Sequence, residues 1–428
     1  MSGLFTAAVA GISWCFCTAS ASLCGAWCGN DKPSTVPPSA TSGRKRSVLL
    51  LAISGVVALV FQYGFAPNYD KISWQYLSDA WTSGCGTDAS EEIMKICAGN
   101  AGVYRSSAAA FVFFVIFGIA AKCKHTANRE AWPAKYVLFL FLCVGTIFIP
   151  NDPIFIPGYM WVARVGSFLF VLVDQLIILD IAYNWNGSWI DKADQAELLE
   201  GVGKGKKWLI AILVSCAIIY ITSFVLIVVM YLKFGGCANN NAFISITLAM
   251  SFICTVVQMT ISETSSLLTS ASMTLYATYL CGSAISLNPI GSCNPYLDEK
   301  STWNIVLGLS MAFLGLMWTG WSFTTSGQLG GRNDAANDRD RGDEERPKAG
   351  GLVLDNESSP GSHGSSEGSK SIGSSWKLNA ILATICCWYA MTLTGWGATE
   401  KRGDVANPNV SEVSMWIMIS SQWVALLL

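Results

Sequence analysis

Long apolar runs with few or no charges are the feature that most restricts how this chain can fold. Ten of them approach or exceed the ~20 residues that a helix needs to cross a bilayer. Backbone polar groups must be paired inside lipid, and the alternating pattern of barrel strands is missing, so we predict an all-α polytopic membrane protein. The ten predicted spans are Ser47–Ala66, Ser106–Ala121, Tyr136–Pro150, Pro157–Tyr183, Lys207–Leu232, Ala242–Ile261, Ser266–Leu287, Trp303–Phe323, Trp376–Trp396 and Val413–Leu428.

The charged residues argue against several classes of function. They make up 13% of the 428 residues and gather between the apolar runs, and the formal net charge of −2 gives no reason to expect a nucleic-acid partner. Histidine occurs only at His125 and His363, both in polar linkers. A Ser-His-Asp triad or a His-rich metal centre would need histidine inside the membrane region. We therefore expect no enzyme, no metal site and no cofactor.

Lys and Arg are shared unevenly between the two sides of the predicted membrane region. With ten spans, most of the 27 basic residues fall on the side of the N-terminus. The positive-inside rule then places the N-terminus and the 327–375 loop in the cytoplasm. Plasma membrane and endomembranes such as ER or Golgi both remain open. Four regions follow: a Cys-rich segment with a basic linker (1–46), eight spans (47–326), a Gly/Ser-rich loop predicted to be disordered (327–375) and two spans (376–428).

The two ends of the chain differ from the other apolar runs. The first 28 residues lack the basic start of a signal peptide. We favour an interfacial or partly embedded helix there, and an eleventh span is the alternative. This segment carries four cysteines in a spacing unsuited to zinc, for which reversible palmitoylation and unmodified thiols both remain open: Cys15, Cys17, Cys24 and Cys28. The last run is short, and we expect the sequence to end inside a helix.

Four further cysteines fall in loops on the outer side of this topology: Cys85, Cys97, Cys237 and Cys293. An even number in an oxidising compartment is typical of disulfides, and four cysteines allow three pairings. We prefer Cys85 with Cys97, which closes a short loop, and Cys237 with Cys293, which joins neighbouring loops. Free thiols are the alternative.

The fourth span contains the stretch FVLVDQLIILDIAYNWNGSW, with two carboxylates inside an apolar segment. A helix over this span is about 40 Å long, which exceeds the ~30 Å bilayer core and predicts a tilt. Asp174 and Asp180 lie about 120° apart around the axis, so they are not a catalytic pair. Arg164 and Gln175 share a face but lie about 16 Å apart. Charges inside a span cost a few kcal/mol, so these groups should face protein or a wet cavity.

These polar residues suggest a track along which lipid headgroups pass while the acyl tails stay in the bilayer. The candidate residues of this track are Asp174, Gln175, Asp180, Arg164, Arg105, Glu263 and Gln258, with the hydroxyls of Ser266, Thr269, Ser270, Ser272 and Thr274. The alternative is that they only hold helices together, at about 0.6 kcal/mol per contact.

Several motifs resemble the serine incorporator family. DIAYNWNGSW after a Gln-containing apolar helix is similar to the family's pattern at this place, although Tyr183 stands where the family usually has His. Arg164 and Asp174 are also not typical of it. Further similar stretches cover essentially the whole chain: Val103-Tyr104-Arg105, FIP (148–150), SLLTSASMTLYATYLCGSA (266–284), CNP (293–295) and MTLTGW (391–396).

The resemblance implies ten transmembrane helices in two subdomains, crossed by a long tilted fourth helix. It also implies passive, ATP-independent phospholipid scrambling linked to phosphatidylserine and sphingolipid metabolism, with membrane phospholipids as partners. The alternative is an accessory protein that promotes serine incorporation into lipids by binding serine-using lipid-synthesis enzymes. An ion or amino-acid transporter and a homo-oligomer also remain open.

Overall fold

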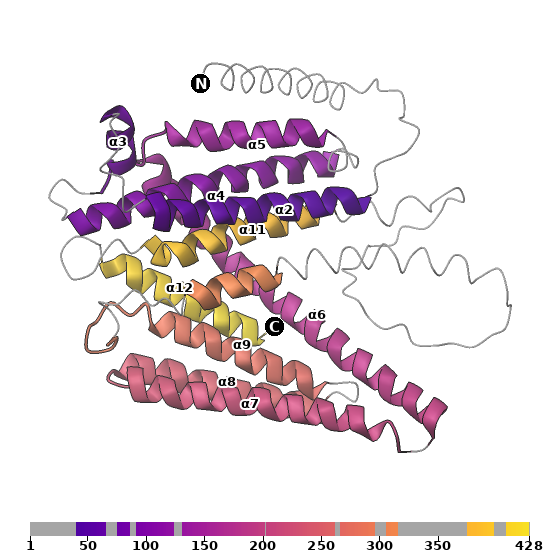
Figure 1. Ribbon diagram of the computed structural model, residues 1–428. Coiled ribbons are helices and arrows are strands. Elements are labelled where there is room, and N and C mark those ends of the chain that lie inside the picture. Colours follow the sequence, from indigo (N-terminus) through magenta and orange to yellow (C-terminus); the bar gives the residue numbers. More distant parts are fainter. Residues whose placement is uncertain are drawn as a thin grey trace, which may run out of the picture. The chain divides into compact units, whose positions relative to one another are not determined.

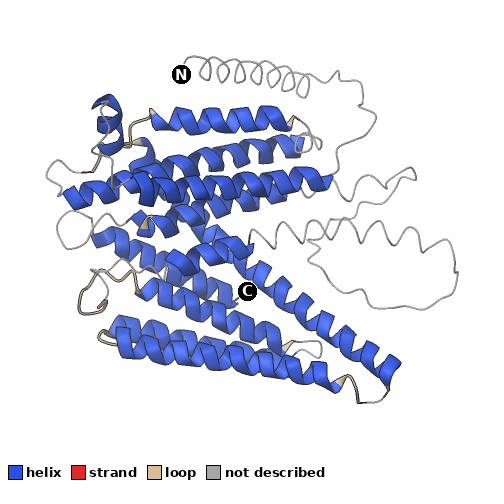
Figure 2. Ribbon diagram, viewed as in Figure 1, coloured by secondary structure: helices blue, strands red, loops and turns tan. Residues whose placement is uncertain are grey.

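The computed structural model describes residues 40–65, 75–85, 91–123, 131–201, 203–261, 266–295, 305–315, 375–397 and 408–427. All regular secondary structure in these ranges is helical (Figure 2), which confirms the predicted all-α class for this part of the chain. The four cysteines of the N-terminal segment, Glu263 and the 327–374 stretch lie outside the described residues.

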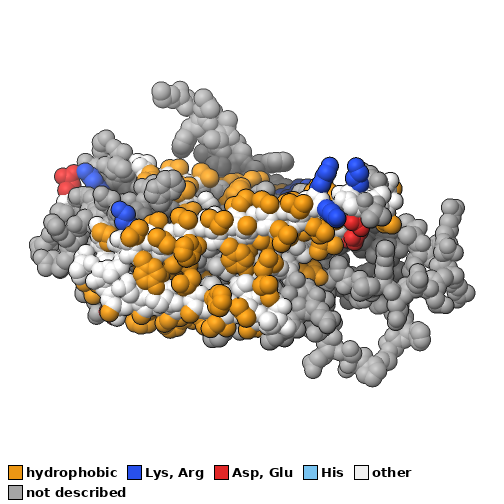
Figure 3. Space-filling model, turned by 90° about the horizontal axis from the view of Figure 1, so that it is seen from below, with side chains coloured by type: hydrophobic (Ala, Val, Ile, Leu, Met, Phe, Trp, Pro, Cys, Tyr) orange, Lys and Arg blue, Asp and Glu red, His pale blue; other side chains and the backbone are white. Residues whose placement is uncertain are grey.

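Five of the described helices are long and apolar enough to cross a membrane: Lys45–Phe65, Met94–Cys123, Ile154–Leu199, Lys206–Phe234 and Ala238–Thr260. Shorter apolar helices cover Trp132–Ile147 and Ile305–Gly315. The face in Figure 3 is covered mainly by hydrophobic side chains, and the charged side chains drawn lie towards its two ends. Apolar surface on this scale fits lipid as the solvent. The chain is therefore a multi-pass membrane protein, and the count of ten spans stays a prediction.

The chain divides into two compact units. In the first, α4 (Glu91–Cys123) lies at the centre and packs against α2 (Ala40–Leu59), α5 (Trp132–Ile147) and α11 (Ser375–Leu393). The short elements η1 (Val60–Phe65) and α3 (Gln75–Thr82) also pack on α4. Small residues allow close approach in this unit, because a Cβ on Gly166 would lie 2.3 Å from the Cys387 sulfur. The α4 helix begins 15 residues before the predicted span at Ser106.

In the second unit, α9 (Leu267–Ile285) is the central helix. It packs against α7 (Lys206–Phe234), α8 (Ala238–Ile261) and α12 (Pro408–Leu427). More than half of the α9 side chains are buried, whereas α7 leaves most of its apolar side chains exposed. The contrast is expected when one helix is wrapped by protein and the other faces lipid.

The α6 helix runs from Met160 to Glu200 and is labelled in Figure 1. At 41 residues it is about 60 Å long. The predicted end at Tyr183 was wrong, because the helix continues through the polar residues after it and stops at Gly201, which has a φ of +100°. Glycine adopts this conformation without steric cost and ends the helix there. The tilt of this helix stays a prediction.

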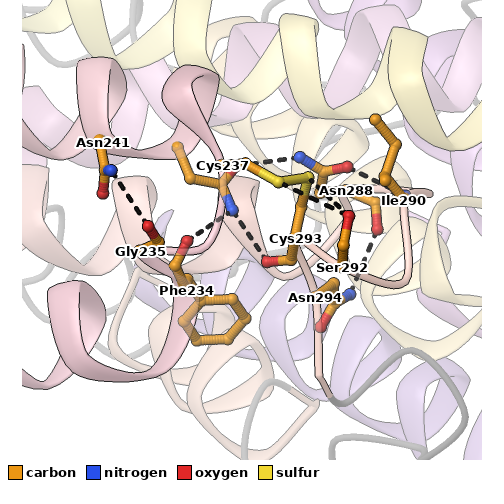
Figure 4. The surroundings of a disulfide bond; sticks show 10 residues. Phe234, Gly235, Cys237, Asn241, Asn288, Ile290, Ser292, Cys293 and Asn294 are labelled. Atoms are coloured by element: carbon orange, nitrogen blue, oxygen red, sulfur yellow. Dashed lines mark hydrogen bonds between the residues drawn. A yellow bond between two sulfur atoms is a disulfide. The ribbon is translucent and has the colours of Figure 1, made fainter.

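The predicted cysteine pairing is present: Cys85 is bonded to Cys97, and Cys237 to Cys293. Around the second disulfide, amide side chains bond to backbone carbonyl groups (Figure 4). Asn240 donates to the carbonyl of Cys293 at 3.0 Å and accepts from Asn288 at 2.9 Å. The α7–α8 turn and the loop after α9 are therefore joined by both covalent and polar contacts.

Loss of the second disulfide should destabilise the protein without unfolding it. Replacing Cys237 and Cys293 together with serine opens a loop of 56 residues, and native disulfides typically contribute about 2–5 kcal/mol. We expect a lower thermal unfolding midpoint in detergent, with the amide contacts preserving the turn. Cys123→Ser, at an exposed free thiol, is the control and should leave the midpoint unchanged. Equal midpoints for the double variant and the wild type would contradict this prediction.

Candidate functional site

The candidate site consists of the buried polar side chains on the apolar helices. Such a side chain is stable in a membrane helix only if it bonds to another polar group or contacts water. The structure separates the residues predicted to line the track. Arg105 and Arg164 belong to the first unit, and Asp174, Gln175, Asp180 and Gln258 belong to the second.

Arg105 on α4 is 1% exposed, and its guanidinium group donates to four backbone carbonyls. Its Nε bonds to Thr146 at 3.1 Å, and one Nη bonds to Ala80 at 3.1 Å and Ile149 at 2.7 Å. The other Nη bonds to Ala101, one helical turn earlier, at 3.1 Å. The carbonyls of Ala80 and Thr146 lie in the last turns of α3 and α5, where helices leave carbonyls without intrahelical partners, and that of Ile149 follows α5. Arg105 therefore fastens three elements together, which favours the interhelical-contact reading at this position.

Two aromatic rings enclose the same guanidinium group. Its carbon lies 4.5 Å from the centre of the Trp81 ring and 4.9 Å from that of Phe155. Such cation–π contacts are strongest where water is excluded. Arg105 thus combines hydrogen bonds and ring contacts in a site with little room for a mobile headgroup.

An apolar groove of about 490 Å³ opens beside this arginine in the first unit. It is lined by α2, η1, α4 and α5, with Ile53, Phe61, Leu140 and Val144 among its walls. Ile53, Leu140 and Val144 are exposed. The lining suits a hydrocarbon chain rather than a polar headgroup.

Arg164 lies in the second turn of α6. It is buried, its Nη2 contacts the Met160 sulfur at 3.6 Å, and its guanidinium carbon lies 4.9 Å from the Trp161 ring centre. These contacts keep its charge near the start of the helix and in the first unit.

Asp174 is the most deeply placed carboxyl group of the described α6 residues, with 2% of its surface exposed. The Tyr276 side chain on α9 lies close to it. The Tyr276 hydroxyl donates to the carbonyl of Val171 at 3.1 Å, three residues before Asp174. A hydroxyl has a single hydrogen, so it cannot donate fully to both groups. Asp174 forms no ion pair with any residue in the described part of the chain.

Gln258 on α8 also bonds to α9, closer to the start of that helix than Tyr276. Its Nε2 donates to the Thr269 hydroxyl at 2.8 Å, and its Oε1 accepts from the Ser270 hydroxyl. Thr269 and Tyr276 are seven residues apart, so they share one face of α9 and lie about 10 Å apart along it. We call the residues Ser266, Thr269, Ser270 and Tyr276 the α9 polar line.

The α9 polar line links two of the predicted residues, Gln258 at one end and Asp174 at the other. Gln175 follows Asp174 and is buried, whereas Asp180 is half-buried further along the helix. The Asn184 amide donates to the Asp180 carboxylate at 2.9 Å and to the Asp180 backbone carbonyl at 2.7 Å. These local bonds tie Asp180 to its own helix.

Sequence reasoning missed two residues that complete this group. Tyr276 lies in the same run as the predicted hydroxyl residues, and its position seven residues after Thr269 was the signal that both lie on one face of this helix. Gln422 on α12 donates to the Thr247 hydroxyl at 2.7 Å and to the Ala277 carbonyl at 3.0 Å. An amide in the otherwise apolar stretch around it was the available clue.

The chain is similar over nearly its whole length to known proteins. Residues 13–428 match the sequence profile of the serine incorporator family. The chain is 26% identical to serine incorporator 3 of Bos taurus, with 97% of this chain and 94% of that protein covered. It is also 26% identical to a probable serine incorporator of Nematostella vectensis, with 77% of each chain covered. A match of this extent shows that the chain belongs to the serine incorporator family.

Proposed function

We propose that this protein moves phospholipids passively between the two leaflets of a membrane, without ATP, in support of phosphatidylserine and sphingolipid metabolism. The observation that carries the proposal is the buried Asp174 on the long apolar α6, next to the α9 polar line. A carboxyl group without a cationic partner among the described residues is costly in a membrane helix, and such groups generally mark a transport path.

The chemistry of phospholipids fits this group. Ethanolamine, serine and choline headgroups carry a cationic nitrogen, which a carboxylate attracts more strongly in a poorly hydrated environment than in water. The hydroxyls of the α9 polar line and the Gln258 amide on α8 supply neutral hydrogen-bonding partners for the phosphate and glycerol oxygens. The apolar groove of the first unit supports the proposal separately, because its lining suits an acyl chain.

In this proposal the protein performs no bond-breaking chemistry and uses no metal or cofactor. A lipid that crosses the bilayer needs its headgroup shielded from the hydrocarbon core, and transport downhill needs no nucleotide. The described residues contain no group of three or more His, Cys, Asp or Glu placed to hold a metal ion. That observation leaves the enzymatic question to experiment.

The proposal predicts lipid exchange in liposomes that contain the purified protein. With phosphatidylcholine labelled on an acyl chain by a fluorophore, so that the headgroup keeps its cationic nitrogen, a membrane-impermeant reductant should bleach more than the outer-leaflet half of the signal, without added ATP. The same liposomes loaded with radioactive serine should release it no faster than empty vesicles, which separates lipid transport from amino-acid transport. Bleaching equal to that of protein-free vesicles would remove the proposal.

The second candidate function is an accessory one, favoured by the names of the relatives, which are called serine incorporators. In that case the protein would bind serine-using lipid-synthesis enzymes and raise serine incorporation into membrane lipids. Deletion should then lower radioactive serine in phosphatidylserine and sphingolipids while purified liposomes show no lipid exchange. Unchanged labelling after deletion would exclude this second function.

A further inference from the structure

The last part of α6 extends beyond the aromatic residues that mark the end of its apolar segment. Trp189 on α6 and Trp208 on α7 have ring centres 5.9 Å apart, and the Lys192 ammonium lies 4.9 Å from the Trp208 ring. Tryptophan and lysine at this kind of position are typical of the membrane–water interface. Leu198 follows Trp189 by nine residues, which places it about 13 Å further along the helix.

Two adjacent leucines at the end of this extension are the most exposed large hydrophobic side chains in the described part of the chain. Leu198 is 84% exposed and Leu199 is 85% exposed. Both are next to the helix end, so neither serves to pack α6 on α7. Paired exposed leucines outside the apolar segment are unfavourable in water and are therefore candidates for a binding partner.

The acidic residues next to these leucines indicate what kind of partner would bind them. The sequence Asp194-Gln-Ala-Glu197-Leu198-Leu199 places one acid four residues before the pair and another directly before it. Both acidic side chains are exposed. An anionic cytoplasmic lipid surface repels carboxylates, whereas a protein groove with basic residues attracts them. The charges favour a soluble protein partner over the membrane.

The backbone next to the leucines can open at small cost. Gly201 and Gly203 both have positive φ angles, +100° and +94°, and they end the helix directly after Glu200. The last turn of a helix also lacks partners for its carbonyl groups and frays readily. Residues 194–199 can thus be presented in extended form, with neighbouring leucine side chains reaching two adjoining pockets.

We propose that residues 194–199 are a docking segment for a cytoplasmic cargo-sorting adaptor, a protein that recognises an acidic residue followed four positions later by the first of two leucines. The partner would provide two apolar pockets for Leu198 and Leu199 and a basic patch for Asp194. Through this contact the protein would be withdrawn from one membrane and delivered to another. The inference depends on the predicted cytoplasmic side of the α6–α7 turn and is independent of lipid transport.

The test uses the full-length protein in nanodiscs of uncharged lipid and a purified clathrin adaptor core as the probe. We expect saturable binding to the wild type and at least tenfold weaker binding to the double variant Leu198→Ala, Leu199→Ala. Asp194→Asn should weaken binding by a smaller factor, and Leu232→Ala, at an exposed leucine of α7, is the matched control with unchanged binding. Equal binding of the wild type and the double variant, or no binding of the wild type, overturns the proposal.

A thiol at position 199 tests the placement of the segment. Leu199→Cys should react with a membrane-impermeant maleimide in nanodiscs, above the labelling of the parent protein with its natural cysteines. In cells the added labelling should require permeabilisation. Labelling in intact cells, or no added labelling in nanodiscs, would place the leucines outside the cytoplasm or in lipid and would exclude the adaptor.

Discussion

Arg105→Leu is expected to destabilise the protein more than any other single substitution among the candidate residues. The leucine would remove a charged donor from four backbone carbonyls, three of which, at Ala80, Thr146 and Ile149, lie outside α4. Hydrogen bonds to charged groups contribute about 1.5–3 kcal/mol each, so the total loss should be at least about 3 kcal/mol even though backbone N–H groups still bond to Ala80 and Thr146. We expect little folded protein after extraction in mild detergent, measured by size-exclusion chromatography and thermal unfolding.

The comparison with lysine separates charge from geometry at this position. Arg105→Lys keeps the charge but loses the planar fork that reaches several carbonyls at once, so its unfolding midpoint should lie between those of leucine and wild type. Arg46→Leu removes an exposed arginine whose carbon is 5.9 Å from the Trp132 ring, and it should change the midpoint little. An Arg105→Leu protein that is as stable as the wild type would show that the carbonyl contacts contribute little.

Asp174→Asn is expected to act in the opposite way, with retained stability and reduced lipid flux. An asparagine amide can donate to the Tyr276 oxygen, so the local contact survives, while the carboxyl group that can become charged beside a cationic headgroup is lost. We expect at least a tenfold lower exchange rate and an unchanged unfolding midpoint. Asp180→Asn is the matched control, because Asp180 is half-buried and bonded to Asn184 on its own helix, and its flux should remain near that of the wild type.

Much of the fold could be predicted from the sequence, because apolar length and loop cysteines act locally. Continuous apolar runs indicated helices, and the four outer-loop cysteines paired as preferred. The end of α6 was placed too early, since hydropathy falls at the membrane surface whereas the helix continues until a glycine with positive φ. The number of spans is harder to predict, because composition alone does not show whether a moderately apolar helix crosses the membrane.

The candidate site was less predictable than the fold, because its contacts join residues distant in the sequence. Asp174 and Gln258 could be picked out as polar groups in apolar segments, but their meeting points on α9 depend on how the helices pack. For Arg105, sequence reasoning proposed a place on the lipid path, while the structure surrounds it with carbonyls from two other segments. The sequence around a buried arginine is the same whether the side chain binds a ligand or holds loops in place, so sequence alone cannot distinguish these two roles.

The most direct test of the account measures lipid exchange and thermal stability on the same liposome preparations of wild type, Asp174→Asn and Asp180→Asn. Phosphatidylcholine labelled on an acyl chain and an impermeant reductant give the exchange rate, and a parallel melt in detergent gives the stability. The account predicts exchange by the wild type and Asp180→Asn, and at most a tenth of that rate for an equally stable Asp174→Asn. Wild-type exchange no faster than that of empty vesicles, or full exchange by Asp174→Asn, would contradict it.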